Sequence, residues 1–397
     1  MLTKYHYIYH GNKIQIDMKE KKNERRAFLG KMALGLSSVV ALPFLFSSKT
    51  KDEDNMEEVH PVKKIKALGF QWETADPFLF CVHHEDKYPK GNDAMGPDAS
   101  LEGRSLGQDF IIKDGWRMYH GGTVPGFPGH PHRGFETITV VREGIVDHAD
   151  STGASGRYGN GDVQWMTAGK GVQHSEMFPL VSKEKENPME LFQIWLNLPK
   201  RSKMVEPHFA MLWNDTIPVI EEKDLDGKLS ATIEIIAGTL KEENAPAPPP
   251  DSWANEKVNH VGIFNIKLEA NSTFELEESV EGVNRTIYYY EGNDLKIQDL
   301  EIPFYHAAEV DPTKNLVIKN GDTVSKILVL QGMPIAEPVV QHGPFVMNTR
   351  EEIQQAFEDY HATQYGGWPW EKYDMVHARE KKRFAKHADG MVELKEG

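Results

Sequence analysis

Short apolar or alternating runs, separated by glycine- and proline-rich stretches, dominate residues 62–240 of the chain. They include Thr137–Val141, Val163–Met166 and Leu191–Leu198. Runs of this length between turn formers are typical of β-strands, and many of them in succession predict a sandwich or barrel. The same pattern returns over residues 258–348, in runs such as Gly262–Leu268 and Arg285–Tyr290. The sequence therefore predicts an all-β protein made of two tandem units.

Two changes of pattern give the boundaries of these units. Residues 241–257 contain the proline-rich stretch Ala245–Pro250, which favours an extended connection because proline cannot donate a ladder hydrogen bond. Past residue 348 the period becomes helical, and Thr349 with Glu352 fits a capping box. The apolar face would consist of Ile353, Ala356, Phe357 and Tyr360. We therefore expect a linker over 241–257 and a C-terminal helix and tail over 349–397.

The first 55 residues are typical of a targeting signal and linker rather than of a folded unit. Basic residues, Arg25 and Arg26 among them, precede an uncharged run from Met32 to Ser48, the order of charged and apolar regions found in export signals. The segment Arg25–Lys31 resembles the twin-arginine signal. We expect export to the periplasm or cell envelope.

Several points of this segment stay open. No obvious cleavage site follows Phe46, and the uncharged run of 17 residues is at the short limit for spanning a bilayer. Cleavage and retention as a membrane anchor are both compatible with the pattern. Met18 would give a conventional short basic region, so translation could start there or at Met1. The alternative interpretation is a basic turn followed by a buried helix in a cytoplasmic protein.

Composition and charge restrict the partners of the folded part. Hydrophobic residues make up 39% of the chain and charged residues 26%, as in ordinary water-soluble globular proteins. Residues 1–49 carry a surplus of six positive charges, which leaves the remainder at −21. Such a surface repels phosphate backbones, so we expect no direct binding of nucleic acid. Cys81 is the only cysteine, so a metal would have to use histidine and carboxylate ligands.

Two matched pairs of ligand-type residues stand in the first unit. His130 and His132 are two residues apart, so on an extended strand both side chains point to the same face, with Cα atoms about 7 Å apart. His174 and Glu176 repeat this spacing after a turn-rich stretch. Four such ligands on two facing strands would leave coordination positions open for a substrate or dioxygen. We therefore expect a metal site at these four residues.

Other candidates are weaker on spacing alone. Glu136 lies four residues beyond His132, an even offset that would place it on the same face of one continuous strand. It could therefore ligate in place of Glu176 or support the ligands from behind. Adjacent residues alternate faces of a strand, which argues against His83 and His84. Five further histidines lack a spacing partner and are expected to be structural or exposed: His148, His208, His260, His306 and His342.

The blocks that carry these residues resemble a known family. His130–Thr137 and Asp162–Met177 look like the signature segments of the pirin family within the cupins. The resemblance continues through Leu191–Leu198 and reaches Gln341–Thr349 in the second unit, so that it covers roughly residues 62–390. Val124 departs from the general cupin motif, which has glycine at that position.

The resemblance implies two cupin barrels, the double-stranded β-helix fold, in tandem. It implies one metal ion per chain, in the first barrel, held by His130, His132, His174 and Glu176, while Glu136 is not a ligand in the family pattern. Ferrous iron (Fe²⁺) is the expected metal, and other divalent first-row metals remain open. The second unit has no His-x-His pair, in keeping with the empty second barrel that is usual in the family.

The resemblance also implies an activity like that of quercetin 2,3-dioxygenase, which opens a flavonol ring with dioxygen. A flavonol and dioxygen would then be the small-molecule partners, and Glu176 would accept the substrate proton. Two alternatives stay open: a non-catalytic iron-binding regulator that binds a partner protein, and a cupin isomerase or hydrolase acting on an envelope metabolite. For the oligomeric state, a monomer is our working expectation.

Overall fold

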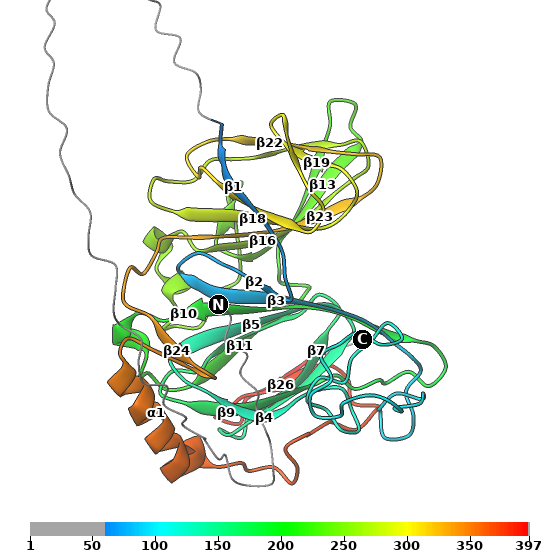
Figure 1. The fold of residues 1–397 in the computed structure, drawn as a ribbon, viewed down its shortest axis with the longest axis vertical. Helices are drawn as coiled ribbons and strands as arrows, with labels where there is room; N and C mark the ends of the chain where they lie inside the picture. Colours follow the sequence, from blue (N-terminus) through cyan, green and yellow to red (C-terminus); the bar gives the residue numbers. More distant parts are fainter. Residues whose placement is uncertain (1–59, 396–397) are drawn as a thin grey trace, which may run out of the picture. The chain divides into compact units, whose positions relative to one another are not determined.

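The computed structural model describes residues 60–395. Nearly all regular structure in this range is antiparallel β-strand, and the single α-helix within it is α1 (Arg350–Thr363). The strands form two barrel-like units, each of two sheets (Figure 1). The predictions of an all-β fold and of a tandem of cupin barrels are confirmed. The predicted export segment, residues 1–55, lies outside the described residues.

The first barrel consists of two six-stranded sheets. One has the order β11 (His208–Leu212), β8 (Val163–Thr167), β5 (Phe135–Glu143), β10 (Asn187–Asn197), β3 (Phe78–Tyr88), β2 (Gln71–Trp72). The other has the order β27 (Val392–Leu394), β26 (Phe384–Lys386), β7 (Ser155–Gly159), β6 (Ile145–Asp150), β9 (Val172–Met177), β4 (Gly126–His132). Large side chains such as Tyr88, Tyr158 and Phe178 fill part of the space around these strands.

The second barrel is built from a seven-stranded and a four-stranded sheet. The larger has the order β1 (Val62–Ala67), β21 (His306–Val310), β18 (Asn284–Glu291), β23 (Ser325–Gly332), β16 (Gly262–Leu268), β13 (Leu229–Ala237), β12 (Val219–Lys223). The smaller has the order β17 (Thr273–Leu276), β22 (Leu316–Asn320), β19 (Leu295–Ile297), β20 (Leu300–Ile302). Its interior is packed with apolar side chains, among them Phe264, Phe274 and Tyr289.

The two barrels share a third core. Side chains of β3, β5 and β10 pack with side chains of β16, β18 and β23, and Trp72 stacks on Tyr288 at a centroid distance of 5.2 Å. Strands β5 and β10 are therefore buried on both faces, which explains the near-continuous apolar runs at Thr137–Val141 and Leu191–Leu198.

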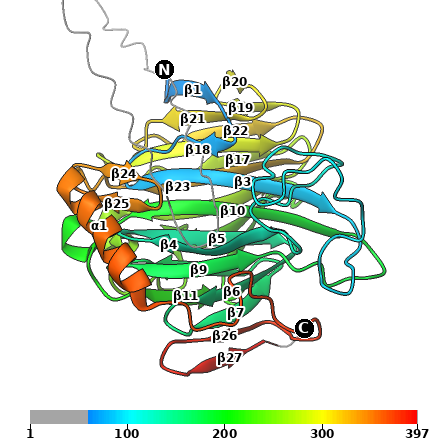
Figure 2. The same cartoon turned by 60° about the horizontal axis from the view of Figure 1, so that its bottom comes forward.

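Strand pairing crosses the predicted boundary at residue 240. Strands β12 and β13 precede residue 240 in the chain but belong to the second barrel, where β13 pairs with β16 and β12 pairs with β13. Strand β1 at residue 62 pairs with β21. In the opposite direction, β26 near the C-terminus pairs with β7 of the first barrel (Figure 2). The alternation of apolar and polar residues predicts that a segment forms a strand. The sheet to which that strand belongs depends on hydrogen bonds to partners that are distant in the sequence. Each barrel is thus completed by a segment from the far end of the chain.

The remaining elements are short or lie at the ends of the barrels. They are β14 (Thr239–Leu240), β15 (Glu243–Asn244), β24 (Val340–His342), β25 (Phe345–Met347) and 3₁₀ turns at Lys200–Ser202, Trp253–Asn255, Lys257–Asn259 and Gln364–Gly366. The capping box of α1 is present as predicted, because Thr349 Oγ1 accepts the Glu352 amide and the Glu352 side chain accepts the Thr349 amide. Within residues 60–395, no helix is long and apolar enough to cross a membrane.

Candidate metal centre

Strands β4 and β9 bring three predicted ligands together inside the first barrel. The strands pair antiparallel, with His130 directly opposite His174, so these two side chains share one face. His132 follows two residues later on the same strand and points the same way. The ring centroids are separated by 4.5 Å, 4.7 Å and 4.9 Å. One nitrogen of each ring lies within 4.8 Å of the other two, so the three rings converge on one point.

A bulge in β4 sets the position of this cluster. The register shifts between Phe127, which pairs with Glu176, and His130. Pro128 and Gly129 together lie opposite the single residue Ser175, so β4 has one extra residue here. A Cβ at Gly129 would lie 2.6 Å from the Tyr373 ring. The Tyr373 ring stacks on Trp368 at 5.3 Å, and the Gly129 amide donates to the Tyr373 carbonyl. The aromatic residues of the tail thus cover β4 from outside the cluster.

The chemical state of the three imidazoles suits a metal cation. Burial lowers the pKa of His130 to about 4 and holds the pKa of His132 and of His174 well below the usual range, so all three rings are neutral at pH 7. The Nδ1 of His130 lies 2.9 Å from the Pro128 carbonyl. A carbonyl only accepts, so Nδ1 carries the hydrogen and the lone pair is on Nε2.

The surroundings of His174 show whether the three rings suit a metal ion. Its ring is fully buried, and neither Nδ1 nor Nε2 has a hydrogen-bond partner among the described residues. An unpartnered buried polar atom costs about 1–3 kcal/mol. A cation bound by the three rings would satisfy one of these nitrogens. The residues present therefore fit a divalent metal of the kind that imidazole binds, such as iron, nickel, copper or zinc.

Glu176 lies beside the three rings, with its Oε2 3.8 Å from Nε2 of His174. Its carboxyl group is held from the other side, because Gln193 Nε2 donates to Oε2 at 2.8 Å and Thr139 Oγ1 lies 2.7 Å from Oε1. Burial raises the pKa of Glu176, and the hydrogen bonds of Thr139 and Gln193 oppose this rise. The three histidines alone form the converging group, and coordination by Glu176 stays a prediction.

The structure does not bring Glu136 to the cluster. Strand β4 ends at His132, and the turn at Arg133 and Gly134 carries the chain into the other sheet before β5 begins. His132 and Glu136 therefore lie on different strands, and the even offset between them does not place their side chains on the same face. The Glu136 carboxyl accepts hydrogen bonds from Thr167 and from Ser252, both at 2.6 Å. It joins the first barrel to the segment that connects the two units.

His148 lies next to the cluster, although the sequence analysis gave it no spacing partner. It is directly opposite Glu176 in the pairing of β6 with β9, and its ring centroid is 5.6 Å from that of His174. Its Nε2 lies 3.2 Å from Oδ2 of Asp150. His148 and Asp150 are two residues apart on β6, the same spacing as that between His174 and Glu176. The spacing rule would therefore have found this pair if it had been applied to every histidine with a carboxylate residue two positions away.

The other histidines lie where the spacing argument placed them. His83 and His84 point to different surroundings: His83 stacks on Phe192, and His84 Nδ1 lies 2.8 Å from the hydroxyl of Tyr119. Among residues 60–395, the three-histidine group is the one cluster of potential ligands that converges on a point. The second barrel is filled by apolar side chains instead.

A double-stranded β-barrel that carries converging histidines on two neighbouring strands defines a metal-binding cupin. Comparison with protein families shows to which cupin family the chain belongs. The model described as Pirin matches residues 59–196, and the model of the Pirin C-terminal cupin domain matches residues 263–366. The chain therefore belongs to the pirin family.

Individual relatives agree with this assignment. A pirin-like protein of Caulobacter vibrioides is 38% identical over 271 residues, which cover 66% of this chain and 88% of that protein. Pirin of Homo sapiens is 35% identical over 252 residues, covering 62% of this chain and 80% of its own. A solved quercetin 2,3-dioxygenase from Acinetobacter baumannii superposes with a TM-score of 0.60 at 25% identity, over 78% of this chain and 96% of that one. The similarity therefore extends over both barrels.

Proposed function

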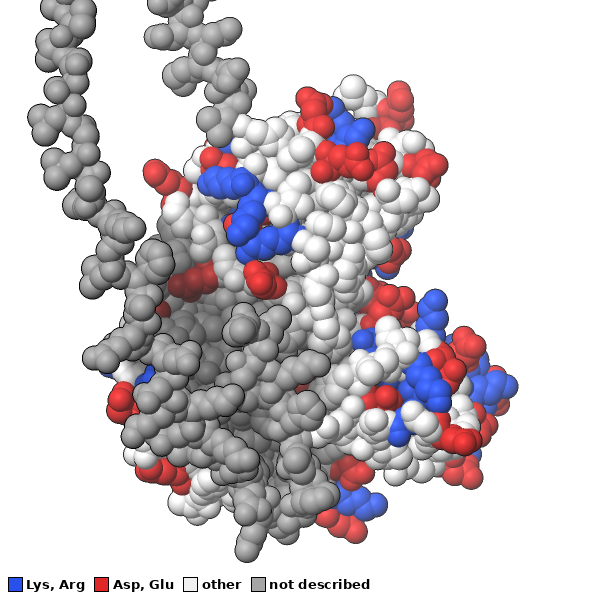
Figure 3. Space-filling view, in the orientation of Figure 1, with Lys and Arg blue, Asp and Glu red and all other residues white. Residues whose placement is uncertain are grey.

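We propose that this protein is a mononuclear metal-dependent dioxygenase that acts on quercetin-type flavonols and uses Fe²⁺. The observation that carries the proposal is the convergence of three neutral imidazoles, of which His130 is half-buried and the other two are buried. Neither ring nitrogen of His174 has a hydrogen-bond partner among the described residues. The structural similarity to a quercetin 2,3-dioxygenase supports the choice of reaction. On the face shown in Figure 3, acidic and basic side chains are intermixed, which favours a small-molecule substrate over nucleic acid.

In this proposal His130, His132 and His174 hold the ion, and Glu176 either completes the ligand set or faces the substrate. The bound ion would act as a Lewis acid toward the flavonol oxygen and dioxygen. Three histidines and one carboxylate would leave positions free for both. His132, His174 and Glu176 are buried, which strengthens the electrostatic contacts among them.

In this proposal Glu176 takes the proton of the flavonol hydroxyl group. Thr139 has a single hydroxyl hydrogen, yet its Oγ1 lies 2.7 Å from Glu176 Oε1 and 2.6 Å from Gln193 Oε1. With Glu176 ionised, that hydrogen can serve one of the two acceptors only. With Glu176 protonated, its O–H donates to Thr139 and the Thr139 O–H donates to Gln193. The network therefore has a defined place for one additional proton, on Oε1 of Glu176.

The experiment is anaerobic loading of the full chain with Fe²⁺, followed by quercetin and air. Loss of the flavonol absorbance with release of carbon monoxide is the expected result. His174→Ala should bind no stoichiometric metal and show no turnover, whereas His361→Ala, at an exposed position of α1, should match the wild type in both. Full metal occupancy with unchanged flavonol absorbance would refute the dioxygenase and leave a metal-binding regulator.

We also propose that the protein is exported, on the basis of the twin-arginine-like segment Arg25–Lys31. An envelope enzyme would meet flavonols from outside the cell before they enter the cytoplasm.

A further inference from the structure

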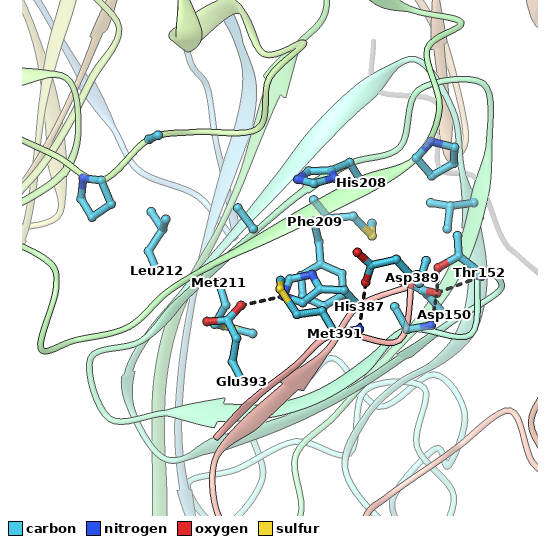
Figure 4. Close-up of a pocket in the computed structure, with 18 residues that line it drawn as sticks. Asp150, Thr152, His208, Phe209, Met211, Leu212, His387, Asp389, Met391 and Glu393 are labelled. Atoms are coloured by element: carbon cyan, nitrogen blue, oxygen red, sulfur yellow. Dashed lines mark hydrogen bonds and ion pairs between the residues drawn. The ribbon is translucent and has the colours of Figure 1, made fainter. Parts of the chain in front are cut away.

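A cavity of about 500 Å³ opens on the flank of the first barrel. It lies between strand β11, the turn that follows β6, and the C-terminal hairpin of β26 and β27 (Figure 4). Its volume is within the range of small-molecule sites, about 300–1,000 Å³. None of the predicted metal ligands lines it. The cavity is therefore a separate candidate site.

The walls of this flank cavity are apolar and partly aromatic. The ring of Phe209 stacks on that of His387, with 4.8 Å between centroids and 21° between planes. Methionine side chains of Met166, Met211 and Met391 also line it. Flexible methionines adapt to ligands of different shape, and a ring pair of this kind offers a surface for a planar group.

The charges of the flank cavity all have one sign apart from histidine. Three carboxylates line it, Asp150, Asp389 and Glu393, and no lysine or arginine does. Two of them have internal partners: Glu393 accepts hydrogen bonds from Trp213 and lies 2.6 Å from His387, and Asp150 accepts from the turn at Thr152. Asp389 is exposed, and its Oδ1 accepts the amide of Met391. Its Oδ2 has no hydrogen-bond partner among the described residues, so this oxygen is accessible to a ligand in the cavity.

We propose that the flank cavity binds a compact organic cation with an aromatic body, such as an aromatic amine. The aromatic group would lie against the rings of Phe209 and His387, and the ammonium group would face the carboxylate of Asp389. Because three carboxylates and no lysine or arginine line the cavity, an anion of the same shape should bind more weakly than the cation. This inference goes beyond the proposed dioxygenase, because it uses none of its ligands.

A wall of protein separates the flank cavity from the metal centre. It consists of Phe209, whose ring lies 5.5 Å from that of His148, and of the His148–Asp150 pair. His148 in turn lies beside His174. Binding in the cavity should therefore not require a metal ion in the barrel. This gives a direct way to tell the two sites apart.

The test is NMR of the full chain with ¹³C-methyl methionine, titrated with tyramine, its neutral analogue p-cresol and its anionic analogue 4-hydroxyphenylacetate. Tyramine should shift the methyl signals of Met166, Met211 and Met391, while that of Met204, which is 54% exposed and outside the cavity, stays unchanged. Tyramine should bind about five-fold or more tightly than the anion. The titration should be the same with and without metal.

Substitutions of Asp389 test the charge selection without touching the core. Asp389→Asn should weaken tyramine binding about two- to five-fold, and Asp389→Lys should abolish the preference for the cation. The control is Asp226→Asn, at an exposed turn far along the chain, which should change nothing. Binding of the anion equal to or tighter than that of tyramine would overturn the ligand class. Absence of shifts at the three methionines, or shifts that vanish on metal removal, would overturn the site.

Discussion

Substitution of Glu136 by glutamine should make the protein more stable at alkaline pH. The carboxyl group is fully buried, with hydrogen bonds from Thr167 and Ser252 at 2.6 Å each. Burial raises its pKa from 4.5 to about 7, although both hydroxyl groups favour the ionised form. The folded protein therefore holds a proton at Glu136 that the unfolded chain has already released, over the interval between these two values.

The sign and size of the effect follow from this difference. Where the folded state binds more protons than the unfolded state, the free energy of unfolding falls as pH rises. A rise of the pKa from 4.5 to about 7 corresponds to about 3 kcal/mol at about 1.4 kcal/mol per pKa unit. The destabilisation caused by Glu136 is absent well below pH 4.5, grows between pH 4.5 and about 7, and is complete above about pH 7. Glutamine keeps a polar amide at this position and does not titrate.

The assay is urea unfolding of the wild type and of Glu136→Gln at pH 4.5, 6 and 8. The difference between the two unfolding free energies should change by about 3 kcal/mol in favour of the variant between the lowest and the highest pH. Histidines that titrate in the same range are common to both proteins and cancel. Glu184→Gln, at an exposed position, should show a difference that does not depend on pH. A constant difference for Glu136→Gln as well would refute the reasoning.

Three further predictions concern other parts of the chain. His132→Ala should abolish stoichiometric metal binding by elemental analysis and leave most of the circular dichroism spectrum intact, because it removes one ligand from an apolar barrel; full iron occupancy would contradict the site. Thr349→Ala removes the side-chain cap of α1 and should cost about 1 kcal/mol in chemical denaturation, whereas an unchanged midpoint would speak against the cap. Conversion of Arg25 and Arg26 to lysine should retain the protein in the cytoplasm on fractionation, and unaltered fractionation would remove the export proposal.

The candidate site was accessible from the sequence because its geometry is local. Alternation along a strand places His130 and His132 on one face whatever the rest of the molecule does. The same rule served for His174 and Glu176. It failed at Glu136, because the turn at Gly134 intervenes: Gly134 has a φ of +85°, which glycine adopts without strain and which ends β4 there. One residue in the left-handed region thus changed the sheet to which Glu136 belongs.

The sequence by itself determined the strand-rich character of the chain, the helix that begins after Thr349, and the two pairs of ligand-type residues. These depend on neighbours within a few positions. Only the tertiary structure decided that β4 pairs with β9 with a bulge before His130, that His148 lies beside His174, and that β1, β12 and β13 complete the second barrel. These features depend on pairing between segments as many as 248 residues apart, as for Val62 of β1 and Val310 of β21. Local alternation of polar and apolar residues contains no information about which distant strand supplies the partner.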